Sequence, residues 1–196
     1  MGLLGDFLAE LTSGDDERAD AAVEKIAALG ENCVDDPIDV LQELLSSPDS
    51  EIRWWGVRAL ASISDPRVVS ILIEALADEG AAVRQCAALG LRLHPTPQAI
   101  AGLIDCLSDE DHLVVELSAD ALAEIGEQAV PALITVVENE NPKARLEAVR
   151  SLARIGDRRA IPVLFGVLDE GSVLMEYWAA EGLERMGVGM VFYKPE

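Results

Sequence analysis

Residues 52–63 read Ile52-Arg-Trp-Trp-Gly-Val-Arg-Ala-Leu-Ala-Ser-Ile63, and related segments recur along the chain. One of them is Val83-Arg-Gln-Cys-Ala-Ala-Leu-Gly-Leu91, and another is Ala144-Arg-Leu-Glu-Ala-Val-Arg-Ser-Leu152. Residues 114–122 and 175–183 follow the same pattern. Small and apolar residues in these segments have the three- and four-residue spacing of one helix face. The repetition predicts a chain that uses one helical unit several times.

Two sets of leucines give the length of this unit. Both sets have spacings of 31, 31, 30 and 31 residues: Leu41, Leu72, Leu103, Leu133 and Leu164, and Leu60, Leu91, Leu122, Leu152 and Leu183. Phe7 and Ile26 each lie 34 residues before the first leucine of a set, which indicates a degenerate first repeat. We therefore expect one domain over 1–196, with repeats at about 3–35, 36–65, 66–96, 97–127, 128–157 and 158–187 and a C-terminal cap at 188–196.

Each repeat is expected to hold two helices, called helix A and helix B in chain order. Start signals are a capping residue followed by proline, and they occur at Asp36-Pro37, Asp65-Pro66, Thr96-Pro97 and Asn141-Pro142. Stop signals are glycines placed for a left-handed helix end, at Gly30, Gly126, Gly156 and Gly187. One helix pair cannot bury its apolar face alone, so the pairs must stack. The predicted fold is all-α, a right-handed α-solenoid of about six two-helix repeats.

The composition limits the kinds of partner. The chain has 36 Asp and Glu against 15 Lys and Arg, a formal charge of -21, which disfavours nucleic acid and anionic membranes and favours a partner protein with a basic face. Three dispersed cysteines make no disulfide framework, and neither a signal peptide nor a membrane-length apolar run is visible, so we expect a cytoplasmic protein. Low Lys with high acid fits either a salt-adapted organism or a GC-rich genome.

Two segments resemble a known repeat type. Ala160-Ile-Pro-Val-Leu-Phe-Gly-Val-Leu-Asp169 and Ala144-Arg-Leu-Glu-Ala-Val-Arg-Ser-Leu-Ala-Arg-Ile-Gly-Asp157 are similar to the short HEAT-like repeat named after the phycobilisome (PBS) lyases, and the resemblance extends from about Leu41 and more weakly from Leu3. This family includes bilin lyase subunits, phycobilisome-degradation factors, adaptors and DNA-glycosylase-like members. The resemblance implies a ladder of ion pairs between helices, made by arginines and acidic residues: Arg53, Arg84 and Arg145, with Asp49, Asp78 and Asp109. Val115 and Glu176 interrupt it, so contacts there are weaker or that surface serves another purpose.

Solenoids bind partners on the surface lined by successive B helices. Four of the five Trp and Tyr residues fall at one pair of outward positions in helix B, in repeats two and six. Aromatic residues beside arginine are typical of binding hot spots, although a large aromatic can also simply pack against a neighbouring helix. The predicted partner-binding residues are Trp54, Trp55, Arg58, Gln85, Leu89, Leu117, Glu147, Arg150, Arg154, Tyr177, Trp178 and Glu181.

The sequence contains no pattern typical of catalysis. His94 and His112 are the only histidines and lack the spacing of a metal site, so we expect neither a metal nor a cofactor. Cys86 is either an exposed thiol or a small residue in an Ala-rich helix. We expect a non-enzymatic scaffold that holds a partner protein in its concave groove. The alternative, by resemblance, is a phycobilisome-related factor, either a bilin lyase subunit or a degradation factor. A DNA-glycosylase-like enzyme would need a basic cleft, which the charge disfavours.

Overall fold

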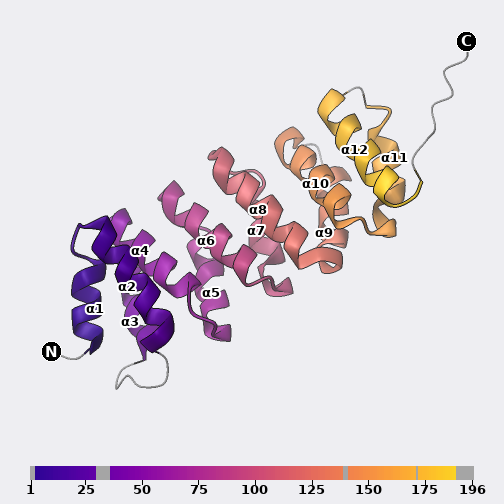
Figure 1. The fold of residues 1–196 in the computed structure, drawn as a ribbon. Coiled ribbons are helices and arrows are strands. Elements are labelled where there is room, and N and C mark those ends of the chain that lie inside the picture. Colours follow the sequence, from indigo (N-terminus) through magenta and orange to yellow (C-terminus); the bar gives the residue numbers. More distant parts are fainter. Residues whose placement is uncertain (1–2, 30–35, 139–140, 171, 189–196) are drawn as a thin grey trace, which may run out of the picture. The chain divides into compact units, whose positions relative to one another are not determined.

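The computed structural model describes residues 3–29, 36–138, 141–170 and 172–188, which form α-helices, short 3-10 turns and no strand (Figure 1). The chain divides into two compact units, unit 1 (Met1–Thr96) and unit 2 (Pro97–Glu196). Unit 1 contains α1 (Leu3–Leu11), α2 (Asp16–Leu29), α3 (Pro37–Leu44), α4 (Ser50–Ala61), α5 (Pro66–Ala75) and α6 (Ala81–Leu93). Unit 2 contains α7 (Ile100–Cys106), α8 (His112–Ile125), α9 (Val130–Glu138), α10 (Pro142–Ile155), α11 (Ile161–Val167) and α12 (Val173–Arg185).

Within each unit, the helices stack as pairs. Odd-numbered helices are the predicted A helices and even-numbered helices are the predicted B helices. In unit 1, α2 packs on α4 and α4 on α6, while α3 packs on α5. In unit 2, α8 packs on α10 and α10 on α12, while α7 packs on α9 and α9 on α11. The prediction of an all-α solenoid is therefore confirmed, whereas the single domain over 1–196 stays a prediction. No helix in the described part of the chain has the length and apolarity needed to cross a membrane.

The leucines that revealed the repeat are the centre of the core. From Leu41 to Leu164, all nine leucines of the two sets in the described repeats are fully buried, and Leu183 is nearly so. Burial of one such side chain contributes roughly 1.5–3 kcal/mol, so within each unit the two rows hold each pair of helices to its neighbours.

Most helix ends follow the predicted signals. The side chains of Asp36, Asp65 and Asn141 accept hydrogen bonds from the backbone N–H groups two residues on. Thr96 differs, because Pro97 starts a 3-10 turn (Pro97–Ala99) and α7 begins only at Ile100, with no side-chain cap. Such a tighter turn commonly precedes a short helix.

The glycine stop signals are confirmed wherever the structure describes them. Gly126, Gly156 and Gly187 have φ values of 75°, 69° and 75°, which only glycine adopts without strain. The predictions for Gly30 and for the cap beyond Val188 lie outside the described residues.

The arginine ladder exists, with partners in the following repeat. The Arg53 side chain is only 6% exposed and donates to both carboxylate oxygens of Asp78, at 2.8 and 2.9 Å, and to the carbonyls of Ser47 and Pro48. Arg145 likewise donates to Glu170, at 2.6 Å. Asp49 caps α4 instead of pairing with Arg53. The ladder is thus a set of brackets that tie helix B of one repeat to the loop of the next.

Candidate functional site

The B helix α4 carries a compact aromatic and arginine cluster. The rings of Trp54 and Trp55 meet edge to face with centroids 4.6 Å apart, and the Arg58 guanidinium lies 5.5 Å from the first ring and 5.9 Å from the second. Trp54 is half-buried, but Trp55 is only 5% exposed, so the predicted exposure of Trp55 is wrong. Its outward register in the sequence was misleading because Trp54 and Arg58 both lie over its ring.

Arg58 is also engaged by the preceding B helix. Its Nε and Nη2 atoms donate to Oδ1 of Asp20, on α2, at 3.0 and 2.6 Å. Cation–aromatic contact and the ion pair together fix the guanidinium. A partner at this surface would therefore meet an arginine that is already held in place.

A small hollow, called the Leu89 hollow, lies beside this cluster in unit 1. It has a volume of about 230 Å³ and is lined by Val23, Arg58, Ala61, Ser62, Cys86, Leu89, Gly90 and Leu93. Leu89 was predicted to face outward and is 36% exposed, whereas Leu93, which the sequence reasoning missed, is 61% exposed. Gln85 is half-buried. A signal for Leu93 existed, since it lies one helix turn after Leu89.

The structure decides between the two interpretations of Cys86. The side chain is buried, and burial raises the pKa of its thiol to about 11, with Arg58 acting in the opposite direction. At neutral pH the thiol is protonated and therefore a poor nucleophile. The exposed-thiol interpretation is wrong, and Cys86 is a small core residue of an Ala-rich helix.

A larger hollow, called the Trp178 hollow, is shared by three successive B helices of unit 2, α8, α10 and α12. It has a volume of about 400 Å³, within the range of small ligand sites. It is lined by Glu116, Asp120, Arg150, Ala153, Arg154, Trp178, Glu181 and Arg185. Four of the predicted binding residues meet here: Arg150, Arg154, Trp178 and Glu181.

The remaining predicted residues of unit 2 lie around this hollow or apart from it. Tyr177 is 59% exposed and contacts Trp178 edge to face, with a centroid distance of 5.2 Å. Leu117 and Glu147 are half-buried. Glu116 and Asp120 were missed as binding residues, although they occupy the same repeat positions as Trp54 and Arg58. Their register was the signal that could have found them.

The arginines of the Trp178 hollow are paired with carboxylates. Arg154 donates to Asp120 at 2.5 Å and to Glu124 at 2.9 Å. Arg150 lies 3.1 Å from the Glu147 carboxylate and 3.5 Å from that of Asp120. Arg185 lies 3.3 Å from the carboxylate of Glu181, one turn earlier in α12. Charges of both signs therefore hold one another across neighbouring helices.

Glu147 is the strained member of this network. Its side chain is 12% exposed, and its Oε2 atom is buried without a hydrogen bond, although it pairs with Arg150. Burial raises the pKa of the Glu147 carboxyl, Arg150 and His112 lower it, and Glu116 and Asp120 raise it further. The net result is a carboxyl whose pKa lies above its ordinary value of 4.5, because the folded state favours the protonated form.

This shift predicts a pH dependence of stability. An acid whose pKa is raised in the folded state does not lower the free energy of unfolding well below pH 4.5, where it is protonated in both states. The loss of stability grows as the pH rises from there through the folded-state pKa. As the pH rises from about 4 to about 7, the Tm of the Glu147→Gln variant should therefore rise by a few degrees relative to that of the wild type. Melting curves at several pH values, with exposed Glu110→Gln as the control, measure this gain. Parallel Tm curves for Glu147→Gln and wild type would contradict it.

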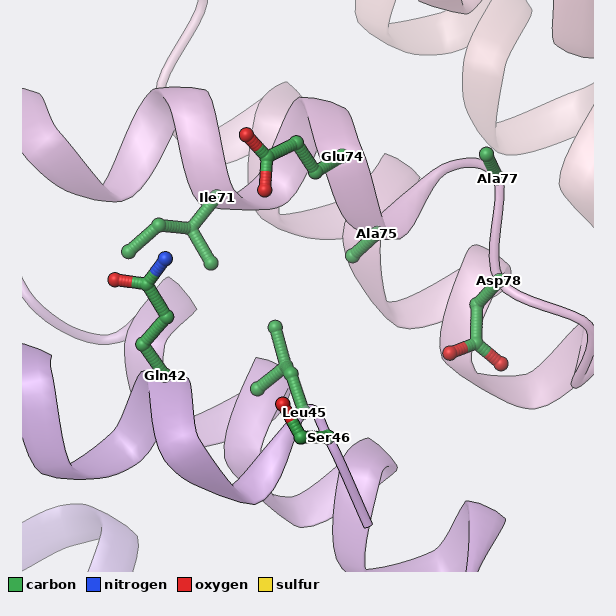
Figure 2. Close-up of a pocket in the computed structure, with 8 residues that line it drawn as sticks. All are labelled: Gln42, Leu45, Ser46, Ile71, Glu74, Ala75, Ala77 and Asp78. Carbon is green, nitrogen blue, oxygen red and sulfur yellow. The ribbon is translucent and has the colours of Figure 1, made fainter. Parts of the chain in front are cut away.

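A third hollow lies between the A helices α3 and α5 of unit 1 (Figure 2). It has a volume of about 290 Å³, and Figure 2 shows the Gln42 amide pointing toward Ile71, with Asp78 at the far end. Asp78 is already bound by Arg53. None of the predicted binding residues lines this hollow, and it gathers no aromatic side chain.

Comparison with known proteins identifies the repeats. The model of the HEAT repeats family matches residues 5–92, 72–135 and 100–184. A phycocyanobilin lyase subunit beta from Nostoc sp. is 44% identical over 48 residues, which span only 24% of this chain and 24% of that protein.

Solved structures share the fold at low sequence identity. The complex of CpcE and CpcF of phycocyanin lyase from Nostoc sp. matches with a TM-score of 0.59 and 19% identity, over 76% of this chain and 96% of that one. A designed armadillo repeat protein in complex with the peptide (KR)4 matches with a TM-score of 0.53 and 18% identity, over 94% of this chain and 100% of that one. Because the family model covers most of the chain, this protein belongs to the HEAT repeat family.

Proposed function

We propose that this protein is a non-enzymatic scaffold that binds a partner protein on the surface of its B helices. The observation that carries the proposal is the Trp178 hollow, where three successive B helices place an aromatic side chain among paired charges. Aromatic residues and arginine are enriched where binding energy concentrates. The formal charge of -21 favours a partner with a basic face.

The two units offer different surfaces to such a partner. In unit 1, Arg58 lines the Leu89 hollow and lies 5.5 Å from the Trp54 ring, and Leu89 and Leu93 are the exposed apolar residues of the lining. In unit 2, exposed Tyr177 lies beside Trp178. Both surfaces belong to B helices, as is usual for solenoid binding faces. Trp55 contributes through packing under Trp54 rather than by direct contact.

Site-specific photo-cross-linking tests the proposal. A photoreactive amino acid replaces Tyr177, on the B helix α12, and in a matched protein it replaces Ala101, which is exposed on the A helix α7 of the same unit. We expect a defined protein adduct in native lysate from position 177 and none from position 101. Trp178→Ala should reduce the adduct, because truncation of a hot-spot aromatic costs about 2 kcal/mol. Equal adducts from the two positions, or none from either, would rule out a B-helix binding face.

A second candidate function is a phycobilisome-related role, as a bilin lyase subunit or a phycobiliprotein-degradation factor. The 44% identical segment shared with a phycocyanobilin lyase subunit beta supports it. In this role the indole of Trp178, on α12, would stack on an open-chain tetrapyrrole. Mixing the purified protein with phycocyanobilin tests this role. A shifted absorbance band that Trp178→Ala abolishes would support it, and an unchanged spectrum would remove the bilin from consideration.

A further inference from the structure

One carboxylate of the Trp178 hollow is left without an internal partner. The side chain of Glu116 forms no hydrogen bond or ion pair with any described residue, although it lines the hollow together with Asp120 and Arg150. Each of the three arginines of the lining already pairs with a carboxylate of α8, α10 or α12. The one charged lining group available to a ligand is therefore an acceptor.

The network around the hollow carries more negative than positive charge, which also favours a cationic ligand. Three guanidinium groups, those of Arg150, Arg154 and Arg185, face five carboxylates, those of Glu116, Asp120, Glu124, Glu147 and Glu181. An anionic ligand would have to displace one of these carboxylates from its arginine, in a chain of formal charge -21. A cationic ligand meets Glu116 directly and displaces nothing.

Trp178 adds a surface suited to the same ligand. The indole lines the hollow together with charged side chains of α8, α10 and α12. Trp is the aromatic residue that attracts a guanidinium or ammonium group most strongly, and its ring also packs against the alkyl stem of Lys or Arg. A carboxylate and an indole in one hollow therefore bind a long cationic side chain by its head and its stem together.

We propose that the Trp178 hollow binds one lysine or arginine side chain from a basic segment of the partner protein, with Glu116 accepting its N–H groups and Trp178 packing against it. This inference rests on the proposed scaffold function, since it names the chemistry that the partner presents.

A binding experiment with the full chain tests the inference. The probe is a fluorescent capped octapeptide of alternating Lys and Arg, and the measurement is fluorescence anisotropy at low ionic strength. Glu116→Gln should weaken binding about tenfold, the effect of losing one charge-assisted hydrogen bond. Glu110→Gln removes the same charge from an exposed loop position in the same unit and should change the Kd less than twofold. Trp178→Leu, which keeps an apolar side chain, should weaken binding about threefold.

Three outcomes would overturn the inference. They are equal losses in Glu116→Gln and Glu110→Gln, no binding of the basic peptide to wild type, and tighter binding of an oligoglutamate peptide. The cross-linking experiment is independent of all three. An adduct at position 177 without peptide binding would support the scaffold function and refute the cationic ligand. Glu116-dependent peptide binding without an adduct would support the cationic ligand and refute the B-helix binding face.

Discussion

Arg53→Met should lower the melting temperature of this protein by about 10 °C, because it removes one partner of a buried ion pair and leaves the other. Arg53 holds Asp78 with two hydrogen bonds, and also reaches Glu79 and the carbonyls of Ser47 and Pro48. The Asp78 side chain is only 15% exposed. Without the guanidinium, water reaches this carboxylate poorly, and the two repeats lose their bracket.

The pKa of Asp78 predicts how the stability from the Arg53–Asp78 pair depends on pH. Burial raises the pKa of this carboxyl, but the hydrogen bonds from Arg53 and the Gly80 N–H outweigh burial, and the pKa lies below its ordinary value. A depressed pKa means that the stability from this pair is present above the unfolded-state value of 3.8 and is lost as the pH falls through the folded value. In Arg53→Met most of this acid sensitivity should be absent.

Two further variants make the test specific. Arg67→Met removes an arginine that pairs with Asp36 and Asp65, but this arginine is 53% exposed. Exposed pairs contribute little to stability, so its Tm should change by at most a few degrees. Arg53→Met with Asp78→Asn should recover part of the loss, because no buried charge is stranded. Equal Tm values for Arg53→Met and Arg67→Met would refute the bracket.

The fold was predictable because its signal is repeated. Leu60 and Leu91 mark the same core position, so chance errors at one repeat are corrected by the others. Local rules also sufficed for the caps at Asp65 and Asn141, because both partners lie within three residues. The failure at Thr96 shows where propensity rules end, since Pro97 can begin a 3-10 turn as readily as an α-helix.

The site was only partly predictable because exposure depends on neighbours in space. Trp55 and Trp178 occupy one repeat position, yet one is buried under Trp54 and Arg58 and the other lines a hollow. Glu116 was passed over because a lone acid on an acidic chain is unremarkable. Its importance lies in which arginines are already paired, and the two partners of Arg154 lie 34 and 30 positions away in the sequence. Such information appears only when the helices are in place.

Gly182→Ala should destabilise the protein by about 2 kcal/mol, although alanine is the better helix former by about 1 kcal/mol. A Cβ atom at Gly182 would lie 2.8 Å from both the Cα and Cβ atoms of Ala153 and 3.2 Å from Leu164. The Cα atom belongs to the backbone of α10 and cannot move aside, so α10 and α12 would have to separate. Ala153, which Gly182 approaches, is also a lining residue of the Trp178 hollow.

Gly166→Ala is the matched control in the same repeat. Gly166 lies in α11, and a Cβ atom there would have no neighbour within 4 Å. The same substitution should stabilise the protein by roughly 0.5–1 kcal/mol through helix propensity and a less flexible unfolded chain. Chemical denaturation of the two variants measures both changes, and opposite signs are the expected result. A stabilising Gly182→Ala would mean that α12 does not pack closely on α10 at this glycine. The Trp178 hollow, which both helices line, would then have a different geometry.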